Sequence, residues 1–189
     1  LDNVGIAWVN RARGEAEHGI DPDASFAKAE ETFRRCAKEF PNLFSVPCNL
    51  AETLAARARV ARLRGRDPSP LLDEARASLA RGETVTRHFC VALGWVVASG
   101  EATRWALLAG RDPAPEAAET ARRLEALRAV NPGAVTGLHE GASAELAVAE
   151  HLLRSGGDPS ARLAAARRLL EAAAATSEGG AEAAQLNAE

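Results

Sequence analysis

The chain has 189 residues and a net charge of −3, and its acidic and basic residues are interspersed along the whole length. It therefore lacks the strong positive field that attracts nucleic acid or an anionic membrane, and neither is an expected partner. No apolar run is long enough to span a bilayer. Alanine is abundant and only 4% of the residues are aromatic, so we predict an all-α fold.

Taken in order, the chain reads as pairs of helices separated by Gly, Pro and Asn. Four antiparallel hairpins are predicted, at about residues 1–42, 43–85, 86–132 and 133–176. Their helices are expected at Leu1–His18, Asp21–Glu39, Phe44–Arg64, Asp67–Ala80, Thr86–Ala109, Asp112–Val130, Ala134–Arg154 and Asp158–Thr176. Gly82 makes the end of the second hairpin irregular. A break is expected at residues 177–180, followed by a capping or frayed tail that ends at residue 189.

Each predicted hairpin tip carries the phrase Gly-x-Asp-Pro. It begins at Gly19, Gly65, Gly110 and Gly156, which lie 46, 45 and 46 residues apart. Glycine suits the left-handed conformation that ends a helix, and Asp followed by Pro suits the N-cap and first position of the next helix. The even period predicts stacked hairpins, an α-solenoid, rather than one irregular globule.

Positions counted from each glycine carry recurring apolar or small residues. The positions seven residues after the glycine are Phe26, Leu72, Ala117 and Leu163, and those ten residues after it are Ala29, Ala75, Thr120 and Ala166. The positions fourteen residues after it are Phe33, Leu79, Leu124 and Leu170, and those seventeen residues after it are Cys36, Gly82, Leu127 and Ala173. The positions seven residues before the glycine are Ala12, Ala58, Thr103 and Ala149. The positions twelve residues before it are Ala7, Thr53, Ala98 and Ala144. Steps of three and four put each set on one helix face, where we expect burial.

The first hairpin resembles the tetratricopeptide repeat. Asn3-Val4-Gly5 followed by Trp8 is similar to the Asn-Leu-Gly and aromatic signature of that family's first helix. The small, aromatic, small and Pro pattern of its second helix is matched by Ala29, Phe33, Cys36 and Pro41. The resemblance implies a right-handed superhelix whose concave face binds a protein or peptide. The period of about 46 residues exceeds the family's 34, so taller hairpins are expected.

Long repeats with this tip phrase are similar to those that follow the catalytic domain of bacterial Ser/Thr protein kinases, chiefly in myxobacteria. That similarity implies a regulatory or interaction region of a signalling protein. Because the chain begins at Leu1 and contains no Met, we expect it to be a segment of a longer protein. The kinase motifs themselves, a glycine-rich phosphate loop with its Lys, His-Arg-Asp and Asp-Phe-Gly, do not occur in the sequence.

No stretch predicts a catalytic, metal or cofactor site. His139-Glu140 lacks the second His of a zinc helix, because Ser143 occupies that position. His88-Phe89-Cys90 offers two kinds of ligand but no second pair nearby, so ordinary packing is the favoured interpretation. The three cysteines, Cys36, Cys48 and Cys90, include no close pair. Neither a disulfide framework nor a metal knuckle is therefore predicted, and a cytoplasmic location is expected.

Polar residues of the first helices form a candidate peptide groove. Arg13, Arg59 and Arg104 each stand six residues before a tip glycine, and stacking would align their guanidiniums for an acidic peptide. The full candidate set is Asn3, Asn10, Arg13, Asn49, Glu52, Arg59 and Arg104. In the alternative interpretation each arginine pairs with a glutamate of a neighbouring helix, and Asn3 and Asn49 are packing residues.

Two functional hypotheses follow from the repeats and from the missing chemistry. The first is a non-enzymatic scaffold that binds a protein or peptide and needs no cofactor. The second is a structural spacer or self-association module, a homo-oligomer without a peptide groove. An enzyme is a distant third hypothesis.

Overall fold

The computed structural model of the protein describes the backbone of residues 2–186 and the side chains of residues 2–176. Over this range it contains eight helices and no strand, as the composition predicts. The helices are α1 (Asp2–Glu17), α2 (Asp23–Glu39), α3 (Ser45–Leu63), α4 (Ser69–Val85), α5 (Phe89–Leu108), α6 (Ala114–Val130), α7 (Val135–Ser155) and α8 (Ser160–Leu186).

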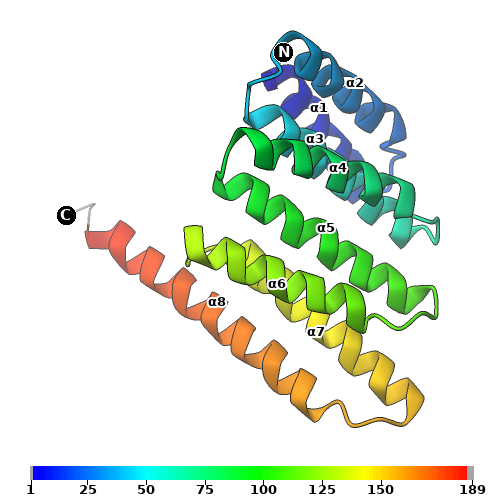
Figure 1. Ribbon diagram of the computed structural model, residues 1–189, viewed down its shortest axis with the longest axis vertical. Coiled ribbons are helices and arrows are strands. Elements are labelled where there is room, and N and C mark those ends of the chain that lie inside the picture. Colours follow the sequence, from blue (N-terminus) through cyan, green and yellow to red (C-terminus); the bar gives the residue numbers. More distant parts are fainter. Residues whose placement is uncertain (1, 187–189) are drawn as a thin grey trace.

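Consecutive helices pair into hairpins 1 to 4, namely α1–α2, α3–α4, α5–α6 and α7–α8, which stack in chain order (Figure 1). The first helices α1, α3, α5 and α7 contact one another in series. Each of α2, α4 and α6 contacts its own first helix and the first helix of the next hairpin. In the described part of the chain no second helix packs its backbone against another second helix. The fold is therefore an all-α solenoid with two layers, as predicted.

Every hairpin tip has the backbone conformation that its glycine predicts. Among the described residues, positive φ angles occur only at Gly19 (72°), Gly65 (68°), Gly110 (70°) and Gly156 (78°). At each tip the residue after the glycine donates its N–H to a carbonyl five residues earlier, as Arg66 does to Ala61 at 2.8 Å. These bonds close the helix C-terminus in the manner of a Schellman motif.

The aspartate of each phrase accepts a hydrogen bond from the start of the helix that follows. Oδ1 of Asp67, Asp112 and Asp158 each accepts a hydrogen bond at 2.9 Å from the backbone N–H two residues later. Oδ1 of Asp21 makes the same contact at 3.4 Å. The predicted stop signal is confirmed at all four tips. The predicted start signal is one residue off, because Pro22, Pro68 and Pro113, and not the aspartates, are the N-cap residues of α2, α4 and α6.

The predicted core positions are buried wherever another hairpin covers them. The exceptions are Leu163 and Leu170 of α8, which are 44% exposed, and Ala7 of α1, which is also exposed. All three face away from the stack at its two ends. The prediction fails there because burial of a repeat position depends on the next repeat, which the local pattern does not contain.

Two predicted helix ends are wrong. Gly82 does not end α4, which continues to Val85, and Gly82 is buried beside Val91 of α5. The break expected at residues 177–180 is also absent, since α8 runs to Leu186. A glycine inside a helix lowers its stability by about 1 kcal/mol but does not end it unless the backbone adopts positive φ. Leu1 and the last three residues of the predicted tail lie outside the described residues.

The prediction that the cysteines form no disulfide is contradicted. Cys48 of α3 and Cys90 of α5 form a disulfide between hairpins 2 and 3, with Cα atoms 6.0 Å apart. They are 42 residues apart in sequence, which is close to one repeat, so stacking brings them together. Cys36 is a free, buried thiol, and its burial raises its pKa.

None of the described helices combines the length and the apolar composition that a membrane crossing requires.

Candidate functional site

A cavity of about 690 Å³ lies along the layer of first helices. Residues of α1, α3, α5 and α7, together with Phe26 of α2, line it, so every hairpin contributes to its wall. Its apolar lining is provided mainly by Ala55, Ala56, Val60, Leu63, Leu93 and Val97. Its charged lining consists of Arg13, Glu17, Glu52, Arg59, Glu101 and Glu140. We call this cavity the groove.

The groove contains part of the candidate set predicted from the sequence. Arg13, Asn49, Glu52 and Arg59 line it. Arg104 is not among the lining residues, but it hydrogen-bonds to two of them, as described below. The remaining two candidates, Asn3 and Asn10, lie exposed on α1 and do not line the groove.

Each arginine of the predicted row contacts a glutamate of the next first helix. Arg13 Nη2 lies 2.6 Å from Glu52 Oε1. Arg59 Nε lies 3.4 Å from Glu101 Oε1, and Arg104 Nη2 lies 2.6 Å from Glu140 Oε2. The pairing that the alternative interpretation proposed is therefore present at all three positions. These pairs join hairpin 1 to 2, 2 to 3 and 3 to 4.

Glu101 is the centre of this ionic network, and its side chain is only 2% exposed. Arg62 Nε donates to one carboxylate oxygen at 2.8 Å, and Arg104 Nη2 donates to the other at 2.7 Å. Burial alone would lower the pKa of Arg104, but Glu101 and Glu140 outweigh that effect and raise it. The guanidinium of Arg104 is therefore held in its charged state beside the groove.

Sequence reasoning missed Glu101, Glu140 and Arg62. The available signal was an acidic residue within the otherwise apolar stretch of α5, together with an arginine 39 residues before it. Arg13 and Glu52 have the same separation of 39 residues. Opposite charges repeated at such a spacing indicate residues that meet when hairpins stack.

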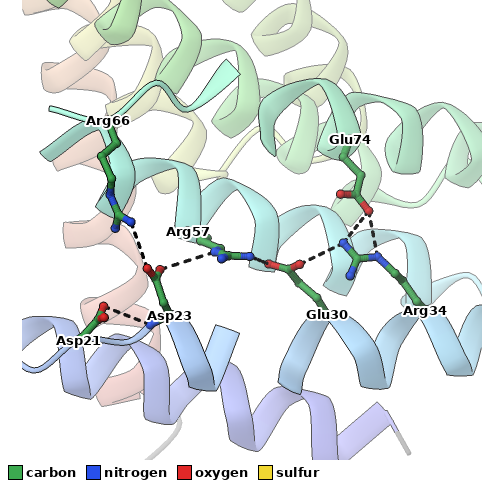
Figure 2. Close-up of polar contacts among 7 residues, drawn as sticks. All are labelled: Asp21, Asp23, Glu30, Arg34, Arg57, Arg66 and Glu74. Atoms are coloured by element: carbon green, nitrogen blue, oxygen red, sulfur yellow. Dashed lines mark hydrogen bonds and ion pairs between the residues drawn. The ribbon is translucent and has the colours of Figure 1, made fainter. Parts of the chain in front are cut away.

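A second buried carboxylate, Glu30 of α2, joins hairpins 1 and 2 (Figure 2). Arg57 of α3 donates to it at 2.9 Å and also lies 3.7 Å from Asp23. Arg34 donates to Glu30 at 3.0 Å and, one hairpin further, to Glu74 of α4 at 2.7 Å. Charged residues of α2, α3 and α4 thus satisfy one another across the boundary between hairpins 1 and 2.

Ion pairs also connect the second helices to one another. Each pair joins residues that are 40 positions apart: Arg34 with Glu74, Arg76 with Glu116 and Glu83 with Arg123. Their N–O distances lie between 2.7 and 3.0 Å. Side chains therefore span the gaps between α2, α4 and α6 where the backbones do not touch.

Asn49 has a packing role as well as a place in the groove wall. Its amide nitrogen donates to Oδ1 of Asp2 at 2.8 Å, and Ser45 donates to the other oxygen of the same carboxylate at 3.0 Å. The contact joins the start of α1 to the start of α3. One side of the Asn49 amide is therefore already occupied by the protein itself.

The residues considered for metal binding have structural contacts. His88 caps α5, since its Nδ1 accepts the N–H of Cys90 at 3.3 Å, and its ring packs against Phe44 and Phe89. Within the described residues no group of His, Cys, Asp and Glu is arranged to hold a metal ion.

Trp95 lies outside the groove. It is buried in the core, and the Arg123 guanidinium carbon sits 3.6 Å from its ring centroid. It also borders a smaller cavity, of about 270 Å³, formed by residues of α4, α5 and α6 together with the segment before α5. The tryptophan therefore supports packing between hairpins 2 and 3.

The groove combines an apolar lining with charged groups, most of which pair with one another or with Arg104, an arrangement suited to holding a ligand by surface contact. Searches of protein-family models, curated proteins and solved structures found no match to this chain.

Proposed function

We propose that the chain is a non-enzymatic scaffold that binds a segment of a partner protein, or a peptide, in the groove. The observation that carries the proposal is the cavity of about 690 Å³ built by all four first helices. A cavity of this size, with both apolar and charged lining, can accommodate several side chains of an extended or helical peptide. The tetratricopeptide resemblance of hairpin 1 supports the same function.

Four of the six charged residues that line the groove are acidic, and within this lining Arg59 is the group best placed to recognise an acidic side chain of the peptide. Arg59 is 58% exposed at its side chain and makes the longest of the three arginine contacts, at 3.4 Å. Its guanidinium therefore keeps donors for a ligand carboxylate. Arg13 is also partly exposed, whereas Arg104 is mostly enclosed by its two glutamates. Arg59 and Arg13 are the residues that would recognise the ligand.

The proposal extends to the setting of the scaffold. We place it in the cytoplasm, as an interaction region of a larger bacterial signalling protein such as a Ser/Thr kinase, because its tip phrase is similar to repeats found there. In that compartment Cys48 and Cys90 would be kept largely as thiols. The reading frame of the parent gene, and the thiol state of the protein isolated from cells under acid quench, test this setting.

Binding is tested by selecting peptides from a random displayed library on the folded 189-residue chain and measuring their affinities by fluorescence anisotropy. We expect enrichment of acidic peptides and about tenfold weaker binding to Arg59→Glu. Val60→Asp, which puts a charge into the apolar lining, should have a similar effect. The matched control is Arg35→Glu on the exposed side of α2, which should bind normally. Selection of no peptide, or equal affinity for all four proteins, would contradict the proposal.

A further inference from the structure

The last hairpin exposes an apolar face, which we call the tail face. It consists of Leu146, Leu153, Leu163 and Leu170, which are 44%, 62%, 44% and 44% exposed. The positions equivalent to Leu163 and Leu170 are buried in every earlier hairpin, as are those equivalent to Leu146. These repeat positions are thus buried in hairpins 1 to 3 and exposed only in hairpin 4.

A first helix is what covers these positions inside the array. Ala117, at the position of Leu163, packs against Ala144 and Val148 of α7. Leu79 and Leu124, at the position of Leu170, lie against glycines of the next first helix, Gly94 and Gly141. The tail face therefore presents the surface against which the first helix of another hairpin packs inside the array.

The opposite end of the stack exposes the matching surface, which we call the head face. It includes Val4 and Ala7 of α1, both exposed. The equivalents of Val4 are Leu50, Trp95 and Gly141, and those of Ala7 are Thr53, Ala98 and Ala144, and all six are buried. The head face carries the residues that, in later hairpins, contact the preceding hairpin.

We propose that two copies of this chain associate head to tail, with α1 of one copy seated on α7 and α8 of the other. The contact repeats the register of the internal interfaces, so it needs no new packing geometry. The inference does not depend on the groove, which lies on another surface of the array.

Two pairs of polar residues across the two faces are complementary in this register. Glu171 faces the partner's Lys28, at the positions where Arg34 and Glu74 meet at 2.7 Å inside the array. Asp158 faces the partner's His18, at the positions where Asp21 and Arg64 meet at 2.6 Å. The first contact keeps an opposite-charge pair although both signs are reversed, as electrostatic complementarity requires.

The predicted arginine row supports the same register. Arg59 and Arg104 meet glutamates of the next first helix, but the fourth hairpin has Glu150 at their position. The head-face residues that would meet Glu150 are the partner's Asn10 and the partner's Asn3, which occupy the positions of Glu101 and Glu140. At this contact the carboxylate of Glu150 stands where the array has an arginine, and two asparagines stand where it has glutamates. The amide N–H groups of the asparagines can donate to the carboxylate.

One pair of like charges also meets in this register. The partner's Arg11 approaches Arg167, at the positions where Arg57 meets Glu30 inside the array. Each of the two arginines already pairs with a glutamate four residues later in its own helix, Arg11 with Glu15 and Arg167 with Glu171, at 2.7 Å. Their charges are therefore partly neutralised before the faces meet.

A head-to-tail contact leaves one head and one tail free, so it propagates unless it closes into a ring. The test is the mass of the 189-residue chain by light scattering over a range of concentrations. The measured mass of the wild type should rise with concentration from the monomer mass of 19.9 kDa through the dimer to larger species.

Two double variants block one face each. Leu163→Glu/Leu170→Glu blocks the tail face, and Val4→Glu/Ala7→Glu blocks the head face. Each double variant alone should stay monomeric, with association at least about a hundredfold weaker.

The decisive sample is an equimolar mixture of the two double variants, because each retains one intact face. It should form a dimer and stop there. Leu108→Glu, at an exposed hairpin tip outside both faces, is the matched control and should associate like the wild type. Circular dichroism confirms folding, which the substitutions should preserve since all four positions are exposed.

Charge reversal tests the register itself. Lys28→Glu and Glu171→Lys should each weaken association, and a head carrying Lys28→Glu should regain affinity for a tail carrying Glu171→Lys. A monomeric wild type, a mixture that fails to dimerise, or a dimer that persists in either double variant alone would overturn the proposal. The last outcome would indicate a symmetric dimer formed by another surface.

Discussion

Nε of Arg62 in α3 lies 2.8 Å from Oε2 of Glu101 in α5, and both side chains are largely shielded from water. The contact joins hairpins 2 and 3 beside the groove. A carboxylate this deeply buried is compatible with folding only because guanidinium groups from two helices surround it.

Glu101→Gln should therefore destabilise the protein strongly. Removing the carboxylate leaves the buried guanidinium of Arg62 without its counter-ion and Arg104 with Glu140 alone, and the loss of one partner of a buried ion pair costs about 3–5 kcal/mol of unfolding free energy. Urea denaturation followed by circular dichroism measures the change. Glu52→Gln is the control, since the exposed pair with Arg13 contributes about 1 kcal/mol or less. Similar losses for the two variants would refute the central role of Glu101.

Two glycine substitutions with opposite outcomes test the tip geometry. Gly65→Ala should lower stability by about 1 kcal/mol, because φ at this residue is 68° and a Cβ disfavours the left-handed region. Gly14→Ala should raise stability by about 0.5–1 kcal/mol, since Gly14 is helical and its added Cβ would meet no neighbour. Thermal unfolding of both variants should move in opposite directions.

The disulfide between Cys48 and Cys90 should make stability depend on redox state. It closes a loop of 42 residues, for which chain entropy predicts about 4 kcal/mol of stabilisation relative to the reduced chain. Guanidinium denaturation with and without a reducing agent measures the difference. Cys48→Ser/Cys90→Ser should show no response to reductant. Cys36 should resist alkylation until unfolding, because it is buried and its pKa is raised.

Acid titration should reveal the paired carboxylate of Glu119. Hydrogen bonds from Arg122 and Arg123 outweigh burial and lower its pKa from 4.5 to about 2. Because the folded pKa lies below the unfolded one, the stabilisation is complete above pH 4.5 and is lost as pH falls toward 2. Carbon-detected NMR of the side-chain carboxyl measures the midpoint. Arg122→Gln should raise it, and a wild-type midpoint near 4.5 would contradict the pairing.

The hairpin tips were predictable from sequence because all their determinants are local. Gly65 ends one helix and Asp67 accepts a hydrogen bond from the start of the next within a few residues, so no distant part of the chain has to be known. Most core positions were predictable for a related reason: the repeat period reveals which residues recur on one face. Leu163, Leu170 and Ala7 were mispredicted because their burial depends on a neighbouring hairpin that the end positions lack.

Pairs that join different hairpins were harder to find. Cys48 and Cys90 are separated by 42 residues, and Arg62 and Glu101 by 39. Neither separation equals the period of about 46, because the helices of adjacent hairpins meet at shifted heights. A search for pairs of cysteines, or of opposite charges, whose separation in sequence is several residues shorter than one repeat would have found both pairs. Four of the seven groove candidates, Arg13, Asn49, Glu52 and Arg59, line one cavity because they all belong to one helix layer.

The arrangement of the second helices has a mechanical consequence. Within the described residues α2, α4 and α6 are linked to each other by long Arg and Glu side chains, whereas the first helices touch directly. Bending the array can therefore lengthen or shorten these links on one side while the apolar core keeps its contacts. Salt screens such pairs, so we expect the links between α2, α4 and α6 to weaken as ionic strength rises, and the resistance of the array to bending to fall with them.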